Sequence, residues 1–294
     1  MARQETGGIK SGEVTAALAR AAGGAPADLY RQLELQSGLP GPRMNTRLAV
    51  AFAQDAARMG TKVDRLIWEM ASLPANEARG ASGKEFVCVC GVLAIGARAA
   101  EDPALRPRAI ELLESRCDDL RFHVREAVPE ALATLGAEMP DLCEHVRPWM
   151  ENYFHAAAVI LALADARWLE TFRKGEHEAP LELLDAAYQL ASDAPRAAFR
   201  YPGHKALVEA LAKVPKELAR RFGMPVFELI EAWAPKSRPE LRDPILANLD
   251  DPGMKKPFAD EIDRIKKALD VAKGPPRDPT RIVQGMRGRG KKRG

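Results

Sequence analysis

The chain is poor in aromatic residues and in cysteine. Phe, Trp and Tyr make up 6% of its 294 residues, and there are four cysteines. Ala, Leu, Arg and Glu are plentiful instead, and these residues favour helices, with Ala side chains small enough for neighbouring helices to approach closely. A hydrophobic content of 46% with 29% charged residues excludes disorder of the whole chain. We therefore expect an all-α fold with a sizeable core.

Long hydrophobic runs are also missing. The two most apolar segments, 86–97 and 155–166, hold twelve residues each, whereas a membrane span needs about 20. The first ten residues, MARQETGGIK, lack the apolar core of a secretory signal. We therefore expect a cytoplasmic chain that does not enter a membrane. In that location the thiols are expected to be reduced, with Cys88 and Cys90 acting as small buried apolar side chains.

Motifs that indicate a particular chemistry are absent as well. There is no Cys-x2-Cys, His-x3-His or His-Glu-x2-His pattern, so no metal site is predicted. Nucleotide-binding and nucleophile motifs are missing too, so neither a cofactor nor a catalytic residue is predicted. The GLPGP segment at 38–42 predicts a turn rather than a phosphate cradle, because its two prolines lack backbone N–H groups.

The sequence does contain a succession of helical hydrophobic patterns, separated by short Gly, Pro or Asp segments. The patterns alternate in pairs of about 30 to 45 residues, which is the period of helix-hairpin repeats. The first helices of the pairs are expected at 27–36, 62–72, 104–116, 140–152, 179–193 and 225–234. The second helices are expected at 43–59, 83–100, 122–136, 154–172, 203–222 and 239–249. Further helices at 13–22 and 255–270 are expected to cap the ends.

One segment carries a more specific pattern. In DLRFHVREAVPEALATLG, residues 119–136, Asp119 is followed after four residues by Val124 and Arg125, and apolar residues continue the helix. This resembles the HEAT-repeat signature, in which a turn Asp leads into a second helix that begins Val-Arg. The resemblance is close over 104–136 and is a matter of general pattern elsewhere. It implies a structural role for Asp119 and Arg125, since the corresponding residues of HEAT repeats join one repeat to the next.

The resemblance also implies a curved α-solenoid of about six stacked helix hairpins with capping helices. The second helices of such a fold line a concave face, which suits a long ligand. Prolines inside the helical patterns fit this architecture, because a bent helix follows the curvature; they are Pro129, Pro148, Pro215, Pro235 and Pro244. The residues expected to contact a ligand on the concave face are Arg125, Arg167, Trp168 and Lys205.

The charge of the chain is unevenly distributed. Residues 281–294 hold six basic residues and no acid while the whole chain carries +3, so the rest of the chain carries −3. The GPPRDPT segment at 274–280 predicts a linker, which separates a helical-repeat domain at 1–273 from a disordered basic tail within 274–294. Flexible Lys/Arg-rich segments neutralise phosphates without base contacts. We expect the tail either to bind a polyanion or only to solubilise the chain, and the residues concerned are Arg287, Arg289, Lys291, Lys292 and Arg293.

Two classes of function follow from these features. In the first, the chain is a non-enzymatic scaffold whose concave face binds a protein or a nucleic acid, while the tail speeds the encounter with a polyanion. In the second, it is an enzyme similar to the DNA alkylation-repair glycosylases that are built from HEAT-like repeats. That resemblance implies a strongly basic concave groove, and the charge of −3 outside the tail departs from it. No catalytic residue is carried over from those enzymes.

HEAT-like repeats also occur in lyases and chaperones for bilin chromophores, but an analogy of fold does not assign that function. The charge of the concave face separates the remaining alternatives. A basic face around Arg125, Arg167 and Lys205 favours a nucleic acid, whereas a neutral or acidic face favours a protein.

Overall fold

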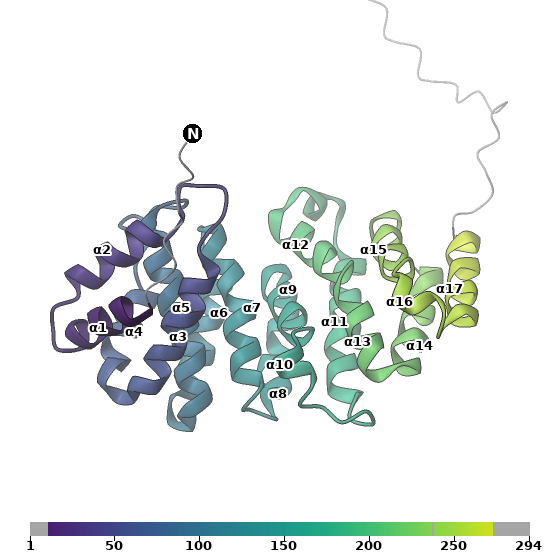
Figure 1. The fold of residues 1–294 in the computed structure, drawn as a ribbon. Coiled ribbons are helices and arrows are strands. Elements are labelled where there is room, and N and C mark those ends of the chain that lie inside the picture. The colour runs from purple at the N-terminus through teal and green to yellow at the C-terminus, as the bar shows by residue number, and fades with distance from the viewer. Residues whose placement is uncertain (1–10, 237, 273–294) are drawn as a thin grey trace, which may run out of the picture.

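The computed structural model describes residues 11–236 and 238–272, and every regular element in these ranges is a helix (Figure 1). The first helices in the chain are α1 (Ser11–Ala22), α2 (Ala27–Gln36), α3 (Thr46–Met59), α4 (Asp64–Ala71), α5 (Gly83–Glu101) and α6 (Arg106–Cys117). The middle of the chain forms α7 (Phe122–Gly136), α8 (Leu142–Val146), α9 (Tyr153–Leu163), α10 (Ala166–Leu169), α11 (Glu178–Asp193) and α12 (Pro202–Leu211). The last helices are α13 (Val214–Phe222), α14 (Met224–Trp233), α15 (Pro239–Leu249), α16 (Pro252–Lys255) and α17 (Ala259–Ala272).

Short 3-10 segments connect several of these helices, namely η1 (Gly60–Val63), η2 (Pro103–Leu105), η3 (Arg147–Glu151), η4 (Arg196–Arg200) and η5 (Ala234–Lys236). The all-α fold expected from composition and periodicity is confirmed for the described residues.

Most helix boundaries lie close to the expected ones, and three larger differences have local causes. The helix expected at 140–152 is an α-helix only over α8 and continues as η3, with Pro148 in the first turn of that segment. The helix expected at 154–172 is divided into α9 and α10 at Asp165, whose side chain accepts a hydrogen bond from the backbone N–H of Arg167 at 2.9 Å. The helix expected at 203–222 is divided into α12 and α13. Pro215 lies in the first turn of α13 and has no N–H with which to continue the hydrogen bonding of α12.

The prolines have two different effects. Pro129 and Pro244 lie inside α7 and α15, as expected for prolines within continuous helices. Inside a helix, proline leaves the carbonyl four residues earlier without its helical partner. The other three prolines interrupt helices instead, because they lie in a first helical turn or in a 3-10 segment; these are Pro148, Pro215 and Pro235.

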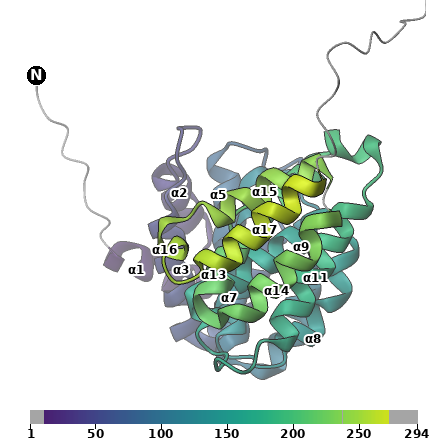
Figure 2. The same ribbon diagram turned by 90° about the vertical axis from the view of Figure 1, so that its right-hand side faces the viewer.

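The helices follow one another along the molecule in chain order, from α1 at one end to α17 at the other (Figure 1). One layer consists of α3, α5, α7, α9, α12 and α15, each packed against the next. Helices of a second layer, α4, α6, α11, α14 and α17, pack against it or against one another. Figure 2 looks along this succession, with α15 and α17 nearest the viewer. The main contacts therefore join elements that are near neighbours in the chain.

Helix α5 is almost completely covered by its neighbours. Every residue from 85 to 99 is buried, and the side chain of Ser82 caps the helix by accepting a hydrogen bond from the backbone N–H of Glu85. Two glycines let the neighbouring helices approach closely. A Cβ on Gly91 would lie 2.3 Å from the backbone nitrogen of Ala71, and one on Gly96 would lie 2.7 Å from the carbonyl oxygen of Ala131. The helix thus forms the centre of the N-terminal half.

Candidate binding groove

A buried ion pair holds the turn that precedes α7. The carboxylate of Asp119 is buried and accepts hydrogen bonds from the guanidinium of Arg121 at 2.8 and 2.7 Å. The same guanidinium donates to the carbonyls of Leu73 and Ala78, in the connection before α5, at 2.8 and 3.3 Å. Burial acts to raise the pKa of Asp119, but the hydrogen bonds from Arg121 outweigh it and hold that pKa below its usual value. Asp119 is therefore joined to the preceding helix pair through Arg121.

Arg125 faces the following helix pair. Its guanidinium donates to the backbone carbonyl of Asp119 and lies 4.8 Å from the ring centre of Phe154 on α9. Asp119 and Arg125 are thus in contact through the backbone carbonyl of Asp119. The carboxylate of Asp119 forms its ion pair with Arg121, not with Arg125. Sequence reasoning does not single out Arg121, because an ion pair between residues two apart in a turn leaves no periodic signal.

Glu85 positions the start of α7. Its side chain has no exposed surface, and its carboxylate accepts hydrogen bonds from the backbone N–H groups of Ala81 at 2.6 Å and His123 at 3.0 Å. The first N–H groups of a helix have no partner within the helix, so a carboxylate from a neighbouring element stabilises them. Glu85 therefore fixes how the beginnings of α5 and α7 lie relative to each other.

Two adjoining depressions lie on the layer formed by α3, α5, α7, α9 and α12. The first, here termed the central groove, runs over α5 between α3 and α7. It consists of hollows of about 440, 150 and 490 Å³ that share lining residues. The second, termed the side hollow, has a volume of about 310 Å³ and lies between α7, α9 and α12. Phe122 and Glu126 line both depressions, so the two form one continuous surface.

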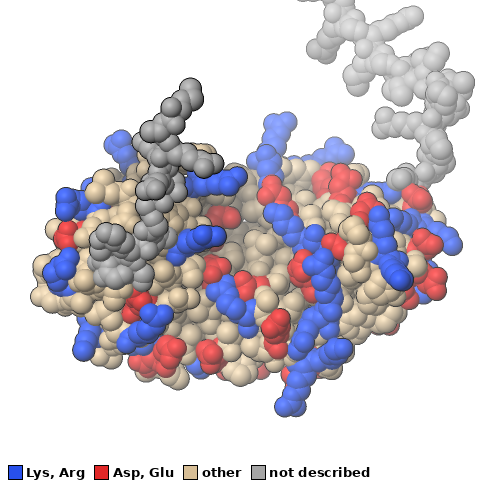
Figure 3. Space-filling model, in the orientation of Figure 1, with Lys and Arg blue, Asp and Glu red and all other residues tan. Residues whose placement is uncertain are grey.

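Positive and negative side chains are equally represented along this surface. The basic residues that line the two depressions are Arg43, Arg58, Arg125, Arg167 and Lys205. The acidic ones are Glu101, Glu126, Glu130, Glu138 and Glu209. Figure 3 likewise shows Lys and Arg interspersed with Asp and Glu on one face of the molecule, which is hollowed between α7 and α12. The surface is therefore close to neutral, not strongly basic.

Two of the basic residues in the central groove are already neutralised by ion pairs. Arg167 pairs with Asp165 at 2.7 Å and with Glu130 at 2.8 Å, and Arg58 pairs with Asp55 at 2.6 Å. These guanidinium groups would have to give up carboxylate partners to bind a phosphate. Arg43 is then the one basic residue of the central groove without an ion pair to a described residue, which is little free positive charge for a polyanion.

The side hollow brings together two of the predicted ligand-contacting residues. Arg125 and Lys205 line it on α7 and α12, together with Glu126 and Glu209. Within the part of the chain that the structure describes, neither Arg125 nor Lys205 forms an ion pair. Arg167, the third predicted cation, lies apart from them in the central groove.

Glu126 lies where the two depressions meet. Desolvation by the surrounding protein raises the pKa of its carboxyl, while the nearby charges of Arg125 and Lys213 act to lower it. A positively charged group of a partner would stabilise the ionised carboxylate at this position.

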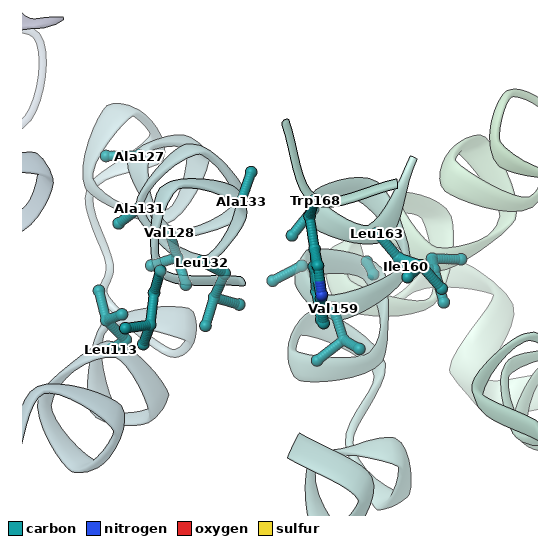
Figure 4. Close-up of a cluster of buried hydrophobic side chains, with 14 of the residues drawn as sticks. Leu113, Ala127, Val128, Ala131, Leu132, Ala133, Val159, Ile160, Leu163 and Trp168 are labelled. Atoms are coloured by element: carbon teal, nitrogen blue, oxygen red, sulfur yellow. The ribbon is translucent and has the colours of Figure 1, made fainter. Parts of the chain in front are cut away.

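Trp168 does not reach either depression, so the prediction that it contacts a ligand is wrong. Its side chain has no exposed surface, and Figure 4 shows it between α7 and α9. A Cβ on Gly136 would lie 2.4 Å from its ring, so the absence of a side chain at Gly136 leaves room for the indole. The cause is the turn at Asp165, which starts a new helix and directs Trp168 inward rather than along the face of α9.

The exposed aromatic residue of this surface is Phe122 instead. It is 58% exposed, is the first residue of α7 and lies at the junction of the two depressions. Aromatic residues, Phe among them, are enriched at the cores of protein interfaces. The one feature of the sequence that could have identified Phe122 is its position just before the apolar repeat of α7, outside the buried stripe.

The remaining residues of interest give no sign of reactive chemistry. All four cysteines are free and buried, and burial raises the pKa of the Cys88 thiol to about 11 and that of Cys143 to about 12. Among the described residues, no three His, Cys, Asp or Glu side chains gather in a way that would hold a metal ion. The basic tail, with Arg287, Arg289, Lys291, Lys292 and Arg293, lies outside the described residues.

Comparisons with protein-family models, with curated proteins and with solved structures find no match to this chain. A search of the described helices for a membrane span finds none of sufficient length and apolar character. The central groove and the side hollow, with their geometry and charge, are therefore the features that indicate a function.

Proposed function

We propose that the chain is a non-enzymatic helical-repeat scaffold that binds a protein partner through the central groove and the side hollow. The proposed architecture is a HEAT-like curved solenoid of about six stacked hairpins. The order of the helices along the molecule and the contact of Arg125 with Phe154 of the next pair support it. A cytoplasmic location is part of the proposal, because the thiols are free and cytosolic proteins keep thiols reduced.

The charge balance of the two depressions is the observation that carries the proposal. A surface with five basic and five acidic residues attracts neither polyanions nor polycations. It does complement a protein segment that carries both signs of charge beside apolar side chains. Phe122 at the centre of the surface supplies the apolar contact that such a segment needs.

The same observation disfavours an alkylation-repair glycosylase, which remains the alternative. Such an enzyme needs free positive charge along its groove to hold DNA, whereas Arg58 and Arg167 are engaged with carboxylates here. A base-release assay on alkylated DNA tests the alternative directly. Release above background that is lost in an Arg125→Ala/Lys205→Ala double variant would establish it in place of the scaffold.

Site-specific photo-crosslinking in cells tests the scaffold function. A photoreactive phenylalanine analogue at position 122 is expected to give discrete protein adducts, because that side chain is exposed at the centre of the surface. The matched control carries the analogue in place of Glu111, an exposed residue of α6 in the other helix layer. Identical adducts from both positions, or adducts from neither, would contradict the proposal.

We propose a separate role for the tail, in which residues 281–294 bind a polyanion and raise its local concentration near the scaffold. Each neutralised phosphate releases counterions, so six basic residues give a plot of log K against log salt a slope of up to about −5 on duplex DNA. Removing 281–294 should abolish most of this slope, whereas Arg125→Ala should leave it unchanged. Equal salt dependence of the full-length and truncated chains would refute this role and leave only solubilisation.

A further inference from the structure

The central groove runs parallel to the helices that form it. One end is lined by the first turns of α3 and α7, at Thr46 and His123, and the other end by the last turns of the same helices and of α5. The three helices therefore point in the same direction. The lining follows α7 from its first turn, at His123, to its last turn, at Thr134, and continues to Glu138 just beyond the helix. The length of α7 corresponds to about 20 Å at the rise of an α-helix.

The floor of the groove is a narrow apolar strip. Val89, Leu93 and Ala97 of α5 follow one another at intervals of four residues and are at most 8% exposed, and Val50 and Ala53 of α3 lie beside them. The walls are helices, whose backbone N–H and C=O groups are paired within each helix. An extended peptide would find no backbone partners there, whereas an α-helix brings its own. Length, direction and floor therefore fit a helix of about four turns.

The two ends of the groove differ in charge. Once the ion pairs of Arg58 and Arg167 are formed, Glu101 and Glu138 remain at one end without an ion pair to any described residue. The C-termini of α3, α5 and α7 lie at that end and add partial negative charge. At the opposite end Arg43, likewise unpaired within the described ranges, lies near the N-termini of α3 and α7.

We propose that the central groove binds an amphipathic α-helix of a protein partner, oriented antiparallel to α3, α5 and α7. Basic residues near the N-terminus of the bound helix lie over Glu101 and Glu138, and acidic residues near its C-terminus lie beside Arg43. In this orientation the positive end of the bound helix faces the three negative helix ends. The proposal rests on the scaffold function and names the class of partner.

A displayed library of 16-residue peptides tests this without knowledge of the natural partner. The library encodes helix-forming peptides whose apolar stripe and charged flanks are randomised, and it is selected against the full-length chain. The expected winners repeat apolar residues every three or four positions, with Lys or Arg in the first half and Asp or Glu in the second. Winners without helical periodicity, or no enrichment at all, would overturn the inference.

Two variants verify where and in which direction the selected peptide binds. Gln54 is exposed, lines the groove and makes no hydrogen bond within the described part of the chain. Gln54→Trp should therefore fill the groove without unfolding the protein and weaken binding about tenfold or more. Glu111→Trp on the other layer is the matched control and should leave the affinity unchanged. Equal effects of the two substitutions would refute binding in the groove.

Charge reversal tests the orientation. The double variant Glu101→Lys/Glu138→Lys should weaken the selected peptide about tenfold at low salt and strengthen, by a similar factor, a peptide with its two charged halves exchanged. No change in preference would refute the antiparallel orientation. Crosslinks at position 122 together with failed peptide selection would reject the helix proposal alone, whereas failure of both experiments would reject the scaffold function as well.

Discussion

The ion pair between Asp119 and Arg121 makes a sharp prediction about how neighbouring helix pairs are held together. Arg121→Ala removes two hydrogen bonds to the carboxylate of Asp119 and two to the carbonyls of Leu73 and Ala78. Both charged side chains are buried, at 2% and 3% exposure, so the substitution leaves a carboxylate in the interior with only part of its partners. Breaking a buried pair costs about 3 to 5 kcal/mol when the remaining charge has no other partner. Arg116 still pairs with the carboxylate of Asp119 at 3.2 Å, so we expect a loss near the lower end of that range.

Urea unfolding followed by far-ultraviolet circular dichroism measures this loss. The matched control is Arg65→Ala, because Arg65 also pairs with a carboxylate, that of Glu69, but is 92% exposed. Exposed pairs contribute about 1 kcal/mol at most, so the control should stay close to the wild type. Adding Asp119→Ala to Arg121→Ala should restore part of the lost stability, since the stranded charge is then gone. A loss for Arg121→Ala no larger than that of the control would refute the reasoning.

Three further predictions concern packing, pH and binding. Gly136→Ala should destabilise the fold by about 1 to 3 kcal/mol, because the new Cβ would lie 2.4 Å from the buried ring of Trp168; a blunt check is the thermal midpoint, which an unstrained site would leave unchanged. The pKa of Asp119 is lowered on folding, so its contribution to stability is present above the unfolded value near 3.8 and is lost as the pH falls through the lower folded value. The free energy of unfolding of Asp119→Asn, measured by urea titration, should therefore fall less between pH 5 and pH 2 than that of the wild type. An equal fall for both proteins would contradict the lowered pKa of Asp119. With the photoreactive analogue at Gln54, further along the central groove, Phe122→Ala should abolish capture of the partner and leave the urea midpoint unchanged, because the Phe122 side chain is exposed. Retained capture would show that Phe122 is not an anchor.

The helices could be predicted from the sequence because their signals are local. Apolar residues recurring every three or four positions mark α5 and α7. The breaks at Asp165 and before Pro215 are exceptions, because the apolar period continues across both of them. An Asp is found both on the exposed face of a helix and at a helix start. The apolar period therefore predicts a helix that continues past Leu163, where α9 ends.

The candidate surface could be predicted only in part. Arg125 and Lys205 are expected on the same face because both lie on second helices of the pairs. In the structure they line the same hollow, on α7 and α12. Trp168 points inward, and Phe122, which has no place in the apolar repeat of α7, is the exposed aromatic residue. The direction of a side chain near a helix end depends on the turn that precedes it, and the periodic pattern carries no information about that turn.

The sequence by itself determined that the chain is helical, where the paired helices lie and that positive charge is concentrated after residue 281. The tertiary structure alone decided which charges meet. Arg167 reaches Glu130, 37 residues earlier in the chain, and Arg121 reaches Leu73, 48 residues earlier. Such contacts depend on how one helix pair stacks on the next, and this stacking is set by close approaches at residues such as Gly91 and Gly96. For this reason the near-neutral charge of the groove, on which the functional proposal rests, became visible only in three dimensions.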